Sequence, residues 1–162
     1  MSRLESAINR LTAQKALLEH VAGLIGEASG TVFELGLGNG RTFDHLRQIF
    51  PTREIFAFDR AIRAHAGCIP DAEHMIVGDM RDTLRLCHPR IPAPPVLVHV
   101  DMGAGDATAD LATREWISPL VAGWTAVGGY VVTDRPLELP GYAEVARPAG
   151  VPASPHLIYR RG

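Results

Sequence analysis

Three glycines at alternate positions make the segment of this chain that is best suited to bind a ligand. Gly36, Gly38 and Gly40 stand at the junction between an apolar run, residues 31–37, and a helical stretch, residues 42–50. Glycine lets the backbone turn sharply and lets a ligand approach the main-chain amides, because no Cβ stands in the way. The helix that follows points its N-terminal amides at the same place. The sequence therefore predicts a small-molecule site at this turn.

Carboxylates accompany this turn at the ends of successive apolar runs. Glu34 lies two residues before the first glycine, and Asp59, Asp79 and Asp101 end or follow the next three runs. The carboxyl ends of parallel strands meet at one edge of a sheet, where open α/β folds bind their ligands. Ionised carboxyl groups accept hydrogen bonds and attract cations, so this edge suits a ligand with donors and positive charge.

A nicotinamide or flavin dinucleotide matches this turn poorly. Its fingerprint, G-x-G-x-x-G, would place a third glycine at position 41, where the chain has Arg41. A side chain of that size would crowd the close packing of helix on strand that the third glycine permits. A nucleotide-dependent oxidoreductase is therefore the less favoured function.

The pattern acidic-x-Gly-x-Gly-x-Gly instead resembles the first motif of the class I S-adenosylmethionine-dependent methyltransferases. Asp59 follows Gly40 by 19 residues, at the place of the family's acid for both ribose hydroxyls. Asp79 and Met80 match the family's acid for the adenine amino group and its apolar neighbour for the ring. The similarity covers roughly residues 30–135.

This resemblance implies S-adenosyl-L-methionine as the cofactor. It implies that Glu34 receives the ammonium of the methionine end, directly or through water, and that Asp101 lies near that end. The glycine turn would line the methionine and the ribose. The predicted cofactor-binding residues are Glu34, Gly36, Gly38, Asn39, Gly40, Asp59, Arg60, Asp79, Met80 and Asp101.

The sequence says less about the methyl acceptor than about the cofactor, because transfer from a sulfonium needs mainly alignment and desolvation from the protein. Residues 101–106 lack the (Asn/Asp)-Pro-Pro-aromatic motif of many amino-directed DNA, RNA and protein methyltransferases. We therefore expect in-line methyl transfer to an unidentified small molecule. The candidate catalytic residues are Asp101, His99 and Asp134, although a buried, hydrogen-bonded role is the commoner one for such a histidine.

Two further alternatives bear on the reaction. Asp101 and Asp134 match two oxygen ligands of metal-dependent O-methyltransferases, but the third position is Arg135. A cation there opposes a divalent ion, so we predict no metal, and expect Asp134 and Arg135 to end a strand or join an ion pair. A non-catalytic cofactor-binding or interaction protein on the same fold is the alternative function.

The elements that must position these residues alternate along the chain. Short runs rich in Val, Ile and Phe predict strands buried on both faces, and helical stretches separate them. The predicted strands are residues 31–37, 54–59, 74–78, 96–101 and 129–134, and the predicted helices are residues 42–50, 60–66, 80–88 and 106–122. This alternation predicts an α/β fold with a doubly wound, mostly parallel, Rossmann-like sheet.

Both ends of the chain extend this core into one domain, residues 1–162. Residues 2–27 predict an amphipathic helix that starts at a capping box of Ser2 and Glu5. Its apolar stripe comprises Leu4, Ile8, Leu11, Leu18, Val21 and Ile25. In the proline-rich residues 136–162, short runs at 142–147 and 156–160 predict an antiparallel hairpin at one edge of the sheet.

Composition bounds the partners. A net charge of −2 from 16 basic and 18 acidic residues argues against a nucleic-acid-binding surface. We predict no membrane partner, since no run approaches the ~20 apolar residues of a spanning helix. The lone cysteines Cys68 and Cys87 and an N-terminus unlike a secretory signal predict a cytoplasmic protein.

Prolines replace a helix after the fifth predicted strand, which leaves one face of the sheet near that strand uncovered. The N-terminal helix or a second subunit must cover this face, and we predict a homo-oligomer.

Overall fold

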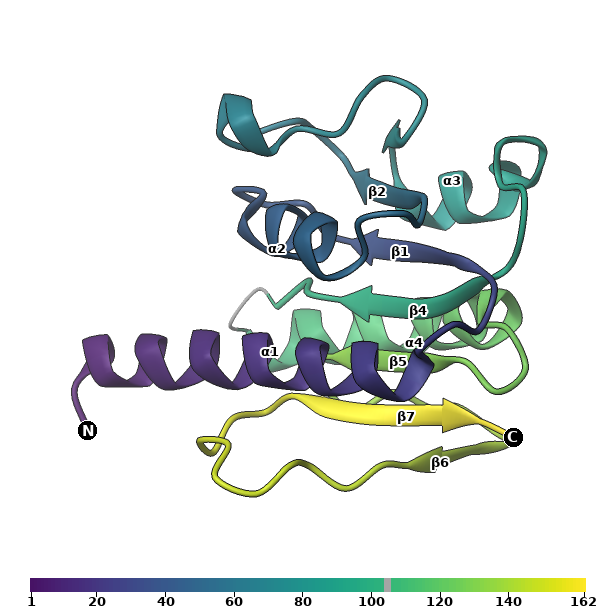
Figure 1. Cartoon of the computed structure of the whole chain (residues 1–162). Helices are drawn as coiled ribbons and strands as arrows, with labels where there is room; N and C mark the ends of the chain where they lie inside the picture. Colours follow the sequence, from purple (N-terminus) through teal and green to yellow (C-terminus); the bar gives the residue numbers. More distant parts are fainter. Residues whose placement is uncertain (104–105) are drawn as a thin grey trace.

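A seven-stranded sheet forms the centre of the protein in a computed structural model that describes residues 1–103 and 106–162. The strand order is β3-β2-β1-β4-β5-β7-β6, in which β7 runs antiparallel to both neighbours and the other pairings are parallel (Figure 1). The strands are β1 (Thr31–Leu35), β2 (Ile55–Asp59), β3 (Met75–Val77), β4 (Pro95–Val100), β5 (Tyr130–Thr133), β6 (Tyr142–Glu144) and β7 (Leu157–Arg161). The predicted doubly wound α/β fold is confirmed.

Helices cover both faces of this sheet (Figure 1). On one face, α1 (Arg3–Ile25) and α2 (Arg41–Ile49) enclose a core with the strands, built on residues such as Leu17 and Leu46. On the other face, α3 (Met80–Leu86) and α4 (Ala107–Trp124) pack a second core against the strands. Every residue of β1 and β4 is buried, as expected for strands covered on both faces, and most of these residues are apolar.

The N-terminal helix starts as predicted but differs in what it buries. The capping box is present, with the Ser2 side chain accepting from the Glu5 amide and the Glu5 side chain accepting from the Ser2 amide. The predicted apolar stripe is wrong over the first turns, because Leu4 and Ile8 are 70% and 53% exposed. Figure 1 shows the reason: the N-terminal half of α1 extends beyond the carboxyl ends of β1 and β4 and has no sheet beneath it.

The predicted helix at residues 60–66 is wrong. This segment is an irregular loop that ends in a short 3₁₀ turn, Ala66–Cys68. Its backbone is held by other elements, since the His65 amide donates to the Asn39 carbonyl (3.2 Å) and Arg47 donates to the Gly67 carbonyl (2.8 Å). A helix of two turns is marginal by itself, so these tertiary contacts decide the conformation.

The C-terminal segment forms the predicted hairpin, in which β6 pairs antiparallel with β7. β7 also pairs antiparallel with β5, so the hairpin completes one edge of the sheet. The sequence left open whether the N-terminal helix or a second subunit covers the sheet beside β5. The C-terminal half of α1 lies there, in one core with Val132 and Ile158. Among the described residues, none of the helices combines the length and apolar character that crossing a membrane would need.

Candidate functional site

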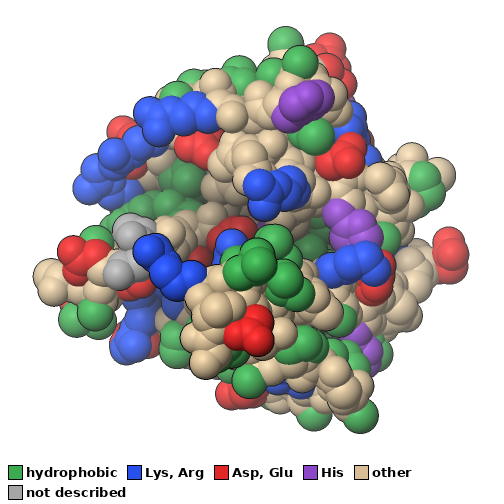
Figure 2. Space-filling model, turned by 90° about the vertical axis from the view of Figure 1, so that its left-hand side faces the viewer, with side chains coloured by type: hydrophobic (Ala, Val, Ile, Leu, Met, Phe, Trp, Pro, Cys, Tyr) green, Lys and Arg blue, Asp and Glu red, His purple; other side chains and the backbone are tan. Residues whose placement is uncertain are grey.

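A cavity of about 630 Å³ opens at the carboxyl ends of the parallel strands. Figure 2 views the molecule from this end and shows a hollow with Lys and Arg side chains along its rim and acidic and hydrophobic side chains inside. Thirteen described residues line it: Gly36, Gly38, Asp59, Arg60, Arg63, Asp79, Met80, Arg81, Asp101, Met102, Gly103, Thr113 and Trp116. Seven of the predicted cofactor-binding residues are therefore gathered at one cavity.

The glycine turn forms one wall of this cavity. Gly36 and Gly38 both have positive φ values, 96° and 54°, a conformation that side chains rarely adopt. A Cβ on Gly36 would lie 2.3 Å from the Asp101 carbonyl oxygen, so β1 and the loop after β4 touch there. A Cβ on Gly38 would meet only open space within 4 Å. The backbone is therefore bare at Gly38, on the side that faces the cavity.

Asp59, the last residue of β2, holds this turn in shape. Its Oδ2 accepts hydrogen bonds from the Leu37 amide (3.0 Å) and the Gly38 amide (3.1 Å), and its Oδ1 accepts from the Arg60 amide (2.7 Å). These bonds use both lone pairs of Oδ2 and one of Oδ1, so one lone pair of Oδ1 is left, because each carboxylate oxygen has two. Asp59 can thus organise the turn and still accept one hydrogen bond from a hydroxyl group in the cavity.

Asp79 caps α3 and forms an ion pair at the opposite wall. Its side chain accepts from the Arg81 amide at the start of the helix and pairs with the Arg81 guanidinium through both oxygens (3.0 and 2.6 Å). These hydrogen bonds from Arg81 hold the pKa of the Asp79 carboxyl well below its usual range, so it is ionised. Arg60 adds a longer contact of 3.6 Å, and the buried Met80 supplies an apolar surface beside the pair.

Behind the cavity, Glu34 and His99 form a buried pair between β1 and β4. The strand register sets them side by side, and His99 Nδ1 lies 3.0 Å from Glu34 Oε2. Both are enclosed, at 1% and 0% exposure. Burial raises the pKa of Glu34; burial alone would lower the pKa of His99, but the nearby Glu34 charge and hydrogen bond raise it.

Three of the predicted cofactor-binding residues, Glu34, Asn39 and Gly40, are not in the described lining of the cavity. Glu34 is enclosed and bonded to His99, so in this arrangement it has no direct contact with the cavity described above. Asn39 and Gly40 also stand outside the described lining: the Asn39 side chain accepts from the Arg41 amide (3.1 Å), and Gly40 is the residue before α2. The Glu34–His99 pair supports the strands that carry Asp101 and the glycine turn. For His99, the commoner buried and hydrogen-bonded role is the one observed.

Asp134, directly after β5, forms the predicted ion pair with Arg135. The guanidinium binds both carboxylate oxygens (2.9 and 3.0 Å) and reaches Asp110 on α4 (2.9 Å). Asp134 also accepts from the Met102 amide (3.2 Å), which ties β5 to the loop after β4. Within residues 1–103 and 106–162, no group of three His, Cys, Asp or Glu residues is arranged to hold a metal ion.

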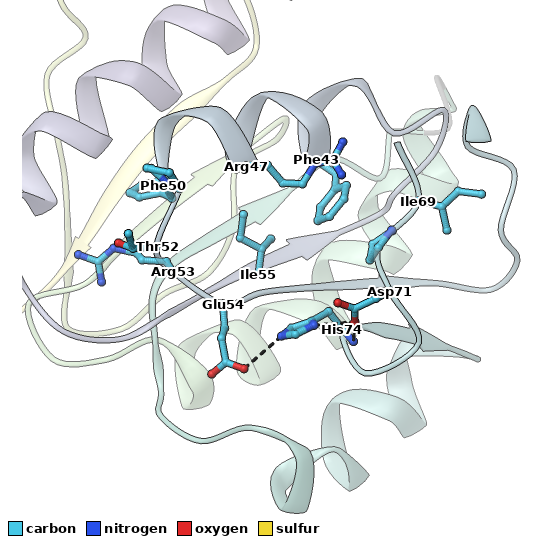
Figure 3. Close-up of a pocket in the computed structure, with 12 residues that line it drawn as sticks. Phe43, Arg47, Phe50, Thr52, Arg53, Glu54, Ile55, Ile69, Asp71 and His74 are labelled. Atoms are coloured by element: carbon cyan, nitrogen blue, oxygen red, sulfur yellow. Dashed lines mark hydrogen bonds and ion pairs between the residues drawn. The ribbon is translucent and has the colours of Figure 1, made fainter. Parts of the chain in front are cut away.

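A second cavity, of about 600 Å³, lies elsewhere, where α2 ends and β2 begins (Figure 3). Its charged side chains and His74 bind one another or the backbone. His74 pairs with Glu54 (3.1 Å) and Asp71 (2.7 Å), and Arg53 donates to the carbonyls of Gly26 and Gly30. None of the predicted cofactor-binding or catalytic residues is in its described lining, so the cavity at the carboxyl ends of the strands is the candidate site.

Sequence reasoning missed several residues around that site. Arg63, Arg81 and Thr113 line the cavity, and no sequence motif marked them. Trp116 also lines it, whereas its position on the predicted helix 106–122 favoured a core residue over a substrate-binding one. Gln14 lies on α1, yet its Nε2 is 2.8 Å from Asp101 Oδ2. The sequence signal that could have identified Gln14 is its place between Leu11 and Leu18 on the apolar stripe of the N-terminal helix, where a polar side chain needs a partner. Residues 104 and 105, within the 101–106 segment discussed above, lie outside the described residues.

Comparison with known proteins identifies the family of this chain. The family model for S-adenosyl-L-methionine methyltransferases matches residues 1–161. A crystal structure of an S-adenosyl-L-methionine methyl transferase from Silicibacter pomeroyi DSS-3 is 40% identical, with a TM-score of 0.92 over 100% of this chain and 99% of that one. No curated protein matches the chain.

More distant structures share the fold. TrmN from Thermus thermophilus is 16% identical, with a TM-score of 0.61 over 95% of this chain and 53% of its own. The sugar N-methyltransferase KedS8 from Streptoalloteichus is 22% identical, with a TM-score of 0.56 over 83% of this chain and 55% of its own. The whole-chain family match and the 40% identical structure show that this chain belongs to the S-adenosyl-L-methionine methyltransferase family.

Proposed function

We propose that this methyltransferase transfers the methyl group of S-adenosyl-L-methionine to a small-molecule acceptor, and that the cavity at the carboxyl ends of the strands binds both. The observation that carries the proposal is the convergence of Asp59, Asp79 and Asp101 with the bare backbone of Gly38 on one 630 Å³ cavity. A volume of this order suits small ligands rather than a macromolecular segment.

The residues present fit the cofactor by their chemistry. The three carboxylates are acceptors, whereas the ribose hydroxyls, the adenine amino group and the α-ammonium are donors. A Cβ at Gly38 would fill space that the structure leaves open. In this proposal Asp59 accepts from one ribose hydroxyl, Asp79 with Met80 holds the adenine, and Gly36 and Gly38 line the ribose and methionine.

In this proposal Asp101 binds the methionine end of the cofactor. Asp101 lines the cavity, whereas Glu34 stands behind it and contacts His99. We therefore place the α-ammonium at Asp101 and give Glu34, Asn39 and Gly40 supporting roles. When bound, S-adenosyl-L-methionine supplies an activated methyl group on a positively charged sulfur, so the residues of the chain need chiefly to align the two reactants and exclude water.

The acceptor side is formed by Met102, Gly103, Thr113 and Trp116. The indole of Trp116 packs partly into the core and offers a flat apolar wall. Of the three candidate catalytic residues, Asp101 is the one in the described lining of this cavity, and in this proposal it binds the α-ammonium. His99 and Asp134 are enclosed or paired, so we assign none of the three as a base for the acceptor.

The partners follow from charge and surface. We propose no nucleic-acid substrate, because the chain carries a net charge of −2. We propose a homo-oligomer, supported by the exposed apolar side chains of Leu4 and Ile8 on the free half of α1. Two free cysteines, Cys68 and Cys87, support a reducing, cytoplasmic setting. Light scattering at micromolar protein tests the assembly; a monomeric mass contradicts it.

Titration calorimetry followed by methyl transfer tests the function. We expect the protein to bind S-adenosylhomocysteine and to gain thermal stability from it but not from NAD. With radiolabelled S-adenosyl-L-methionine, label should move into the small-molecule fraction of a metabolite extract. Absence of S-adenosylhomocysteine binding would overturn the site assignment. Label transferred only to RNA, DNA or protein would overturn the acceptor class, and binding without any transfer would favour the non-catalytic alternative.

A further inference from the structure

Gln14 is a polar residue on the buried face of an otherwise apolar helical segment. It lies on α1 next to Ala13, Leu17 and Leu18, and only 4% of its surface is exposed. Burying a primary amide is unfavourable unless its groups find hydrogen-bond partners. Its Nε2 lies 2.8 Å from Asp101 Oδ2 and 3.3 Å from His99 Nε2, so its partners come from β4 and the residue that follows it.

The orientation of this amide is set by chemistry. Asp101 offers only acceptor oxygens, so the NH₂ group of Gln14, and not its carbonyl, must face it. The same nitrogen can then only donate to His99, which makes His99 Nε2 an acceptor. The His99 proton therefore sits on Nδ1 and is donated to the Glu34 carboxylate, 3.0 Å away. One directed chain of hydrogen bonds links α1 to β4 and β1.

This chain of hydrogen bonds ends at a group that lines the proposed cofactor cavity. Asp101 follows β4, and its backbone carbonyl oxygen would lie 2.3 Å from a Cβ on Gly36, which excludes a side chain there. Its carboxylate is held by Gln14 at Oδ2, which selects one orientation of a side chain that otherwise rotates. A preorganised carboxylate avoids losing rotamer freedom when a ligand binds, and that gain appears as affinity.

We propose that Gln14 is a positioning residue, which holds the Asp101 carboxylate toward the α-ammonium of the cofactor's methionine end. This inference rests on the proposed function, and it goes further by making the N-terminal helix part of the binding machinery. Two features support it: the charge-assisted 2.8 Å bond to Asp101, and the buried Glu34–His99 pair that fixes the direction of donation. The merely structural alternative is that Gln14 attaches α1 to the sheet.

A pair of ligands separates the two roles. S-adenosylhomocysteine carries the amino-acid end, whereas 5′-methylthioadenosine shares the adenosine and the sulfur but lacks the ammonium. Gln14→Met keeps the length and burial of the side chain and removes the donor. Calorimetry should show about a tenfold loss of affinity for S-adenosylhomocysteine and less than about a twofold loss for 5′-methylthioadenosine. A helix that only lost its attachment would weaken both ligands alike.

Controls make the result specific. Gln48 is exposed on α2 and its side chain forms no hydrogen bond or ion pair within residues 1–103 and 106–162, so Gln48→Met should change neither affinity. Asp101→Asn should show the same ligand selectivity, and the double variant should lose less than the sum of the two single changes, because both act on one contact. If Gln14→Met does not fold, as judged by circular dichroism, Gln14→Leu replaces it.

The outcomes are distinct. A selective loss for S-adenosylhomocysteine with non-additivity supports the positioning role. Unchanged affinity, or equal losses for both ligands, overturns it and leaves the site assignment standing. Failure of the unmodified protein to bind either ligand overturns the proposed function itself, which is a different result.

Discussion

The carboxylate of Asp59 accepts the backbone hydrogen of Gly38 at 3.1 Å, so the acid that ends β2 and the glycine turn that follows β1 form one unit. The same Oδ2 accepts from Leu37 at 3.0 Å. An acid expected only to contact the cofactor therefore also shapes the backbone that surrounds it. Substitutions in this unit change binding and stability together, and the two effects must be measured side by side.

Asp59→Ala should weaken binding of S-adenosylhomocysteine at least about tenfold, since a hydrogen bond to a charged group contributes about 1.5–3 kcal/mol. It should also lower the free energy of unfolding by about 1 kcal/mol, because two amides of the turn lose their acceptor. Calorimetry and urea unfolding measure the two quantities. Glu115→Ala, an exposed acid on α4, is the control. Unchanged affinity in the Asp59 variant would contradict the ribose contact.

The two glycines of the cavity wall should respond differently to alanine. In Gly36→Ala the new Cβ would meet the Asp101 carbonyl oxygen at 2.3 Å, so we expect destabilisation by several kcal/mol. In Gly38→Ala the Cβ points into open space, and only the left-handed backbone opposes it, at about 1–2 kcal/mol. Gly38→Ala should therefore fold and lose cofactor affinity. Thermal unfolding with calorimetry checks this, and a Gly38 variant that binds normally would exclude this wall from the site.

Truncating Glu34 of the buried Glu34–His99 pair to alanine should lower the free energy of unfolding more than replacing it with glutamine. Glu34→Ala leaves the His99 Nδ1 proton without an acceptor and should lower the free energy of unfolding by about 1–3 kcal/mol. Glu34→Gln keeps a carbonyl oxygen near His99 and should cost clearly less. Urea unfolding of both variants provides the comparison. Equal losses would show that charge, and not the hydrogen bond, holds the pair.

His156 should make stability depend on pH. It is fully buried, and its Nε2 has no hydrogen-bond partner among the described residues. Burial, with a smaller effect of His99, lowers its pKa from 6.5 to about 4. Between these values the unfolded chain binds a proton that the folded chain does not, so stability falls as the pH falls from about 6.5 to about 4, by about 3 kcal/mol in total from this residue.

His156→Gln removes that titration and provides the test. Other groups shift in their own ways, since His99 and His74 have raised pKa values and favour the folded state at lower pH. The informative quantity is therefore the difference between the unfolding free energies of the two proteins. That difference should change in this pH window and stay level above it. A constant difference from pH 4 to 8 would refute the buried, neutral state of His156.

The sequence alone determined the sheet, the glycine turn and the acids at the ends of the strands. These features are local: apolar runs form strands, glycine permits a positive φ, and an acid that follows a strand reaches the same edge as its neighbours in a parallel sheet. For that reason Asp59, Asp79 and Asp101 could be expected together, and the structure gathers them at one cavity. The hairpin also followed from short apolar runs between prolines.

Only the tertiary structure decided the contacts between residues far apart in the chain. The register of β1 against β4 places Glu34 beside His99, 65 residues away, and so takes Glu34 out of the described lining. Contacts of His65 with Asn39 replace the helix expected at residues 60–66. The projection of α1 past the sheet exposes Leu4 and Ile8 but carries Gln14 onto Asp101. Local propensity cannot determine such pairings, because they depend on how completed elements pack together.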